Sequence, residues 1–175
     1  MILGIDLGTS SVKVQIIDER ENIHTYRGKY SDKKIGCFYS GIKEALKEAE
    51  KELDLKKIEA IGLSSQSCSY ILYNGTEDSP FYSWNDPGGS EYVEKAKELF
   101  SAEEFIKYIS MPCPRMNSYP IPRILWFQEE RKNEWKRMKI LLQPKDYLYY
   151  QLTGMFASDK FLWRGLSNIE KSRCV

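Results

Sequence analysis

The sequence has 175 residues, 42% of them hydrophobic and 29% charged, which is the size and composition of one ordinary globular domain. Its 26 basic and 25 acidic residues leave a formal net charge of +1, so the charge gives no support to a dedicated nucleic-acid or polyanion binder. No apolar stretch reaches the ~18 residues of a membrane-spanning helix, and residues 1–11 lack a signal-peptide pattern, so we expect a cytoplasmic protein with no membrane partner.

The first half of the chain predicts a sheet interrupted by one helix. Residues 2–7 form an apolar run, residues 12–17 alternate apolar and polar side chains, and residues 23–30 follow a polar break, so we expect an antiparallel meander. The clearest predicted helix comes next, with apolar residues at helical spacing: Ile42, Ala45, Leu46, Ala49 and Leu53. Strand character then returns over residues 58–63, and residues 70–73 and 81–84 flank a turn that contains Asn74-Gly75, typical of a hairpin.

The second half of the chain is predicted to be mostly helical. One or two helices are expected over residues 91–110 and another over residues 123–138, with three aromatic residues as candidate buried positions: Trp126, Phe127 and Trp135. Pro144 opens a further helix that reaches about Leu152, and Gly154 is a suitable stop. Three strands, a helix and a strand followed by helices predict an α/β fold with a mixed sheet.

Cysteine, histidine and charge patterns give little support to other kinds of site. The single histidine and four scattered cysteines make a zinc site improbable, and the cysteines are expected to be reduced thiols. The mixed charges between Arg123 and Lys139 predict a solvated helix face.

The first segment with a chemical pattern is Asp6-Leu7-Gly8-Thr9-Ser10-Ser11-Val12-Lys13. A glycine turn after an apolar strand can direct successive backbone N–H groups toward an anion, with hydroxyls as further donors. An acidic side chain beside a phosphate requires a cation, and Mg²⁺ held through water is the natural one. A hairpin with no ligand explains the same residues equally well.

Five segments resemble, in order, the motifs of the FGGY carbohydrate kinases, a family of the actin/hexokinase superfamily. They are the glycine turn, residues 61–69 (IGLSSQSCS), residues 81–86 (FYSWND), residues 118–130 (SYPIPRILWFQEE) and residues 142–154 (LQPKDYLYYQLTG). One motif alone is weak, and the shared order over residues 2–160 carries the resemblance. Three places depart from it. Arg123 replaces the usual Lys, and Pro87-Gly88-Gly89 follows Trp-Asn-Asp where the family usually carries an Arg. Ser67-Cys68 stand where some subfamilies have Met-His and others Arg-Glu.

The resemblance implies a ribonuclease H-like α/β domain with a mixed central sheet and flanking helices, incomplete at its C-terminus. It implies transfer of the γ-phosphate of ATP to a hydroxyl of a sugar or polyol, with ATP and Mg²⁺ as cofactors. Asp6 would hold Mg²⁺ through water, and the phosphates of ATP would face Gly8, Thr9, Ser10 and Lys13. The small-molecule substrate would contact Ser67, Cys68, Trp84, Asp86 and Ser118.

Several of these positions also have a purely structural interpretation. Trp84 can be a packing residue, and Cys68 can be a small buried hydrophobic residue. Gln66 is expected to organise its loop by satisfying backbone groups and not to bind a ligand.

The resemblance also implies sequence beyond these residues. Family members continue into the rest of this domain, which supplies an Asp general base, and into a second domain that binds adenine. We therefore expect residues 1–175 to be a partial N-terminal domain, inactive alone, that self-associates through the face left by the missing part. The alternative is a non-catalytic sugar-binding or regulatory module derived from such a kinase. A chaperone ATPase lobe is disfavoured, because the FYSWND and PKDYL segments have no reason to occur in one.

Overall fold

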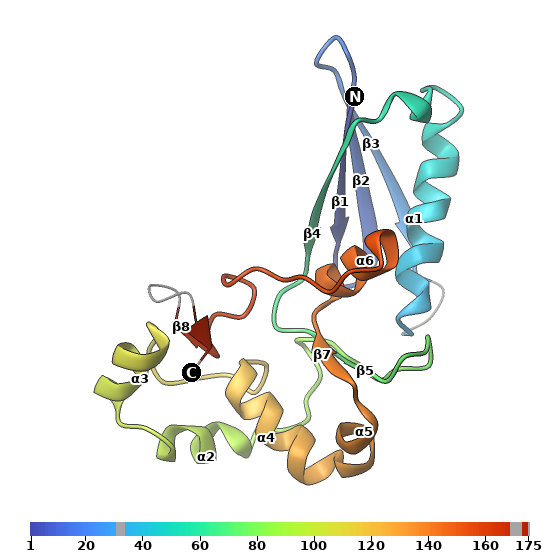
Figure 1. Ribbon diagram of the computed structural model, residues 1–175. Helices are drawn as coiled ribbons and strands as arrows, with labels where there is room; N and C mark the ends of the chain where they lie inside the picture. The colour runs from blue at the N-terminus through green and yellow to red at the C-terminus, as the bar shows by residue number, and fades with distance from the viewer. Residues whose placement is uncertain (31–33, 169–172, 175) are drawn as a thin grey trace.

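The computed structural model describes residues 1–30, 34–168 and 173–174, with side chains through residue 166, and is built around a four-stranded mixed sheet (Figure 1). Its strands are β1 (Ile2–Leu7), β2 (Ser11–Ile17), β3 (Ile23–Lys29) and β4 (Ala60–Ser65). The strand order is β3-β2-β1-β4, in which β1 and β4 are parallel and the other pairs antiparallel. The predicted antiparallel meander is therefore confirmed.

One face of this sheet carries the main hydrophobic core. Alternate residues of β1, namely Leu3, Ile5 and Leu7, are buried there, as the period of two in a strand requires. Helix α1 (Gly36–Ala49) packs on β2 and β3, and α6 (Pro144–Thr153) lies near the lower end of the sheet (Figure 1). Helix α1 approaches β3 closely because Gly28 faces Gly41: a Cβ on Gly28 would lie 1.8 Å from the Gly41 carbonyl oxygen.

A second, three-stranded sheet joins this core to a smaller one. Strand β5 (Tyr70–Tyr73) lies between β6 (Phe81–Tyr82) and β7 (Ile140–Leu142), and all of its residues are buried. Ile71 and Tyr73 belong to the main core, whereas Tyr70 and Leu72 pack in the second core with residues of α4. A continuous apolar run is what a strand buried on both faces requires.

Helices form most of the remaining structure. They are α2 (Tyr92–Glu98), α3 (Ala102–Ile109), α4 (Pro120–Glu130) and α5 (Lys132–Arg137); a 3-10 turn covers Leu55–Lys57, and β8 (Ser167–Asn168) pairs with β9 (Arg173–Cys174). The single helix predicted over residues 123–138 is two helices, because Arg131 adopts a non-helical φ of −119° and ψ of 36°. The αL residue Gly154, with φ of 73°, ends α6 as predicted.

Two further expectations can be compared with the structure. The prediction of a solvated face from Arg123 onward is wrong at Arg123 itself, which is 0% exposed because it lies on the buried side of α4. Cys37, Cys68 and Cys113 are free thiols as predicted, and the side chain of Cys174 lies outside the described residues. No helix among the described residues is long and apolar enough to span a membrane.

Candidate functional site

The turn between β1 and β2 is the candidate phosphate-binding element. Its Gly8 amide donates to the Ser11 carbonyl over 3.0 Å, and a Cβ on Gly8 would approach the same oxygen to 3.0 Å. Gly8 thus closes the turn, in contrast to our expectation that its N–H faces an anion. The amides of Thr9 and Ser10 make no hydrogen bond within the described residues, and both side chains are exposed. These two amides are available to an anion.

Asp6 lies on the polar face of the sheet, opposite the core. Its pairing partners are Lys13 on β2 and Ser64 on β4, and the three residues line a shallow groove of about 420 Å³. No three His, Cys, Asp or Glu residues of the described chain gather in a cluster that could hold a metal ion. A lone half-buried carboxylate fits Mg²⁺ held through water, because Mg²⁺ commonly keeps several waters and few protein ligands.

Gln66 connects this turn to the candidate sugar loop. Its backbone N–H donates to the Leu7 carbonyl over 2.8 Å, and its side-chain Nε2 donates to the Gly8 carbonyl over 3.3 Å. Its Oε1 accepts from the Ser83 hydroxyl over 3.1 Å. With these partners Gln66 organises its loop, in agreement with the expectation from sequence.

Trp84 brings the two predicted ligand-binding regions into contact. Its indole Nε1 donates to the Thr9 hydroxyl over 3.0 Å, although 75 residues separate them in the sequence. Its backbone N–H donates to the hydroxyl of Ser69 over 3.0 Å, so the loop that contains Ser67 and Cys68 supports it. The indole remains 46% exposed, so it is not simply a core residue.

A wide, open cavity of about 640 Å³ is lined in part by Trp84. Three predicted substrate residues line it together: Trp84, Asp86 and Ser118. Asn117 and Arg115 line it as well, although sequence reasoning did not select them. The side chain of Ser118 is only 2% exposed, and its carbonyl accepts from the Tyr70 hydroxyl over 2.9 Å. The structure thus brings three of the five candidates to one cavity.

Ser67 and Cys68 are not among the residues that line this cavity. Ser67 is exposed, and Cys68 is half-buried with a left-handed backbone φ of 56°. Burial raises the pKa of the Cys68 thiol, so the thiol is protonated at neutral pH. They form the loop that supports Trp84.

A fully buried arginine, Arg123, fixes the loop of residues 85–89. Arg123 donates from Nη1 to the Gly88 carbonyl over 2.9 Å and from Nη2 to the Asp86 carbonyl over 3.1 Å. Asn117 Nδ2 donates to the same two carbonyls over 2.9 and 3.0 Å. Burial lowers the pKa of the Arg123 guanidinium, and the Asp86 carboxylate, 3.7 Å away, opposes that shift. The guanidinium fork therefore fixes the backbone beside the cavity.

The glycines of this loop allow its backbone to pack closely against Trp126. A Cβ on Gly88 would lie 2.3 Å from the ring of Trp126, so the backbone rests directly on the indole.

Comparison with known proteins decides the family. Residues 1–162 match the model of the FGGY family of carbohydrate kinases, N-terminal domain. The chain belongs to this family. It is similar to a xylulose kinase of Staphylococcus epidermidis, with 26% identity over 167 residues that cover 87% of this chain and 32% of the relative. The chain thus spans about a third of the length of the curated relatives it matches.

Solved FGGY-type kinases have the same fold. A gluconate kinase of Lactobacillus acidophilus superimposes with a TM-score of 0.84 at 21% identity, covering 99% of this chain and 38% of that one. A glycerol kinase of Plasmodium falciparum with ADP gives a TM-score of 0.81 at 18% identity, covering 99% and 39%. The predicted ribonuclease H-like, actin-like ATPase fold with its mixed sheet and flanking helices is therefore confirmed.

Two of the departures from the FGGY pattern are in direct contact. Arg123, which replaces the usual Lys, binds the backbone of the loop in which Pro87-Gly88-Gly89 replaces the usual Arg-containing segment. A buried guanidinium with two fork contacts is a geometry that Lys does not reproduce. The signal available in the sequence was spacing: Arg123 lies three and four residues before the buried Trp126 and Phe127, which places it on the apolar stripe of α4.

Proposed function

We propose that this chain is part of an ATP-dependent carbohydrate kinase that transfers the γ-phosphate of ATP to a hydroxyl of a small-molecule sugar or polyol. Membership of the FGGY family supports the reaction class. The observation that carries the proposal for this site is the Trp84–Thr9 hydrogen bond of 3.0 Å. It joins a turn with two available amides to a cavity large enough for a monosaccharide, and phosphoryl transfer requires these two ligand sites to be adjacent.

The phosphate end of the site uses backbone and side-chain donors. The Thr9 hydroxyl accepts from the Trp84 indole, so its own proton is left to donate to a phosphate oxygen. The amides of Thr9 and Ser10 add donors, Lys13 adds positive charge, and Gly8 keeps the turn tight. Asp6 would hold Mg²⁺ through water, and the ion would neutralise charge on the phosphates.

The sugar end of the site combines an aromatic wall with polar groups. The exposed Trp84 indole would pack against the carbon-bound hydrogens of the substrate. Asp86 and Ser118 line the same cavity, and Ser67 and Cys68 belong to the loop whose Ser69 supports Trp84. We expect no ATP turnover by this chain alone, because the resemblance implies that the general-base Asp lies outside these residues. A coupled ADP-release assay showing normal turnover would contradict this.

Calorimetric titration of the chain with a panel of ketoses, aldoses and polyols tests the sugar site. We expect at least one compound to bind, and Trp84→Ala to weaken that binding by about tenfold, in line with the loss of one well-packed aromatic contact. Tyr39→Ala is the matched control, because Tyr39 is a similarly exposed aromatic residue on α1 at 49%. A silent panel, or equal affinity of the Trp84→Ala variant, would overturn the proposal.

A further inference from the structure

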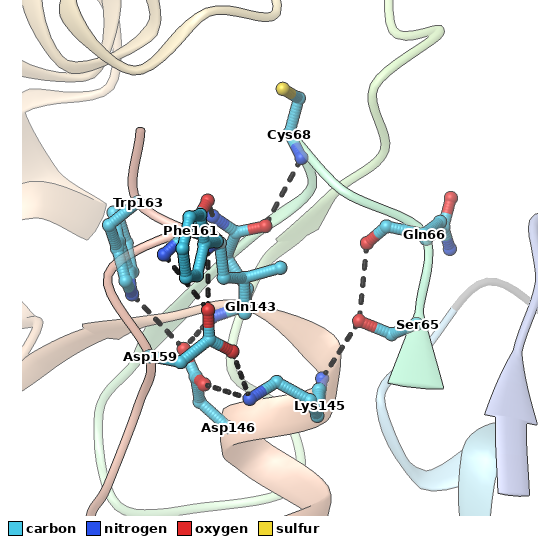
Figure 2. A network of polar contacts seen from close by, with 10 residues as sticks. Ser65, Gln66, Cys68, Gln143, Lys145, Asp146, Asp159, Phe161 and Trp163 are labelled. Carbon is cyan, nitrogen blue, oxygen red and sulfur yellow. Dashed lines mark hydrogen bonds and ion pairs between the residues drawn. The ribbon is translucent and has the colours of Figure 1, made fainter. Parts of the chain in front are cut away.

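The candidate sugar loop contains a residue in an unfavourable backbone conformation. Cys68 has φ of 56°, a left-handed geometry that is unfavourable in a non-glycine residue. Its backbone N–H donates to the side-chain Oε1 of Gln143 over 3.1 Å (Figure 2). This contact comes from the residue that precedes α6, 75 positions further along the chain.

Gln143 uses both ends of its amide. It is 0% exposed, and while Oε1 accepts from Cys68, its Nε2 donates to the Leu162 carbonyl over 2.7 Å. These partners fix the orientation of the amide. If it were reversed, its NH2 group would face the Cys68 N–H and its oxygen would face the Leu162 carbonyl. Gln143 therefore links the sugar loop to the segment that follows α6.

That second segment is itself fixed. The Asp159 carboxylate accepts from the backbone N–H groups of Phe161 and Leu162, both over 2.9 Å, and pairs with Lys145 over 2.8 Å. The Trp163 indole donates to Asp146 over 3.2 Å (Figure 2). The carbonyl to which Gln143 donates is therefore an anchored partner.

The first turn of α6 also contacts the beginning of the candidate sugar loop. The backbone N–H of Lys145 donates to the Ser65 hydroxyl over 3.2 Å, and that hydroxyl donates to the Gln66 carbonyl over 3.2 Å (Figure 2). The first turn of α6 thus holds the loop at Ser65 and at Cys68. Between these points lies the loop's exposed residue, Ser67.

We propose that Gln143 is a positioning residue for substrate binding: it holds Cys68 in its left-handed conformation and so sets the shape of the loop of residues 66–69, which supports Trp84 through Ser69. The inference rests on the proposed function for the identity of the ligand. Gln143 lines none of the cavity beside Trp84 and acts through the loop alone. Ser69, whose hydroxyl accepts from the backbone N–H of Trp84 over 3.0 Å, extends the effect to the aromatic wall.

Alkylation of Cys68 by iodoacetamide measures this positioning without any catalytic turnover. Residues 58–95 form one tryptic peptide that contains Cys68 as its single cysteine, and Cys113 falls in another, so mass spectrometry separates the two rates. In the wild-type chain, we expect the sugar identified by calorimetry to slow alkylation of Cys68. In Gln143→Met, we expect about fivefold faster alkylation of Cys68 and loss of the sugar's protection, as removal of about one hydrogen bond predicts.

Controls separate positioning from general loosening. Gln151→Met makes the same change on the exposed surface of α6 and should leave the rate of Cys68 unchanged. The rate of half-buried Cys113 should also stay constant in Gln143→Met. Two results in Gln143→Met would overturn the proposal for Gln143. One is an equal rise in the alkylation rates of Cys113 and Cys68, and the other is a wild-type alkylation rate at Cys68 with full protection by the sugar. Sugars that bind the wild type without slowing alkylation would also overturn it.

A second variant keeps the test decisive if Gln143→Met does not fold. Gln143→Glu preserves the volume and the acceptor for Cys68 but places a carboxylate oxygen against the Leu162 carbonyl, so we expect about threefold faster alkylation of Cys68. A wild-type rate in this variant would overturn the inference. If no sugar binds the wild-type chain while both Gln143 variants raise the Cys68 rate, the proposed function fails and the positioning of the loop by Gln143 stands.

Discussion

Removing the two side chains that hold the loop of residues 85–89 should cost more together than separately. Arg123 and Asn117 each donate to the same two carbonyl oxygens, those of Asp86 and Gly88. Substitution of one side chain leaves each carbonyl with one donor. Substitution of both leaves two partly buried carbonyls without a protein partner.

The geometry sets the size of each effect. Arg123→Met removes two charge-assisted hydrogen bonds but also relieves a buried charge, so we expect the free energy of unfolding to fall by about 2 kcal/mol. Asn117→Ala removes two neutral hydrogen bonds and should cost about 1–2 kcal/mol. In the double variant the unpaired carbonyls add a coupling energy of about 1–2 kcal/mol beyond the sum.

Equilibrium urea unfolding of the four proteins gives the coupling directly. The dependence of the free energy on urea should stay the same in all four, because none of the changes alters the surface exposed on unfolding by much. The double variant should then lose more stability than the two single variants combined. A loss equal to or below their sum would refute the argument, since it would mean that the two side chains do not share partners in solution.

Two further predictions concern pH and association. Burial raises the pKa of the Asp146 carboxyl above its ordinary 3.8, so the folded chain binds this proton more tightly than the unfolded chain. The resulting stability is present below pH 3.8 and is lost as pH rises through the raised pKa. In urea unfolding, the wild type should therefore lose stability relative to Asp146→Asn as pH rises above about 4. A constant difference would contradict this. Strand β4 pairs only with β1 among the described strands, and its Ile61 is 50% exposed, so one edge of β4 is left open to pair with another chain. We therefore expect the chain to self-associate in sedimentation velocity and Ile61→Lys to reduce this association. A monomeric wild type would count against this prediction.

Local patterns were sufficient for much of the fold. The alternation in residues 12–17 and the apolar run of residues 2–7 predicted the meander, because one buried face imposes a period of two. Pro144 and Gly154 predicted both ends of α6, because each residue favours the backbone conformation that its position needs.

What the sequence did not reveal depends on contacts between distant segments. Charge patterning predicts a solvated face from Arg123 onward, and it fails there because the partners of the guanidinium are backbone carbonyls more than thirty residues away. Gln143 was overlooked for the same reason, since its partners belong to two other segments. Backbone groups have no residue identity, so no motif records them.

Hydrogen bonds connect the two ends of the candidate site, the phosphate turn and the loop that carries Trp84. The Gly8 carbonyl in the phosphate turn accepts from the Tyr30 hydroxyl over 3.1 Å and from Gln66 over 3.3 Å, while the hydroxyl of Thr9 accepts from Trp84. Gln66 in turn accepts from Ser83, the residue before Trp84. A ligand that displaces the indole must therefore break or move a hydrogen bond to the phosphate turn. The candidate sugar and phosphate ends of this site are consequently coupled through protein groups.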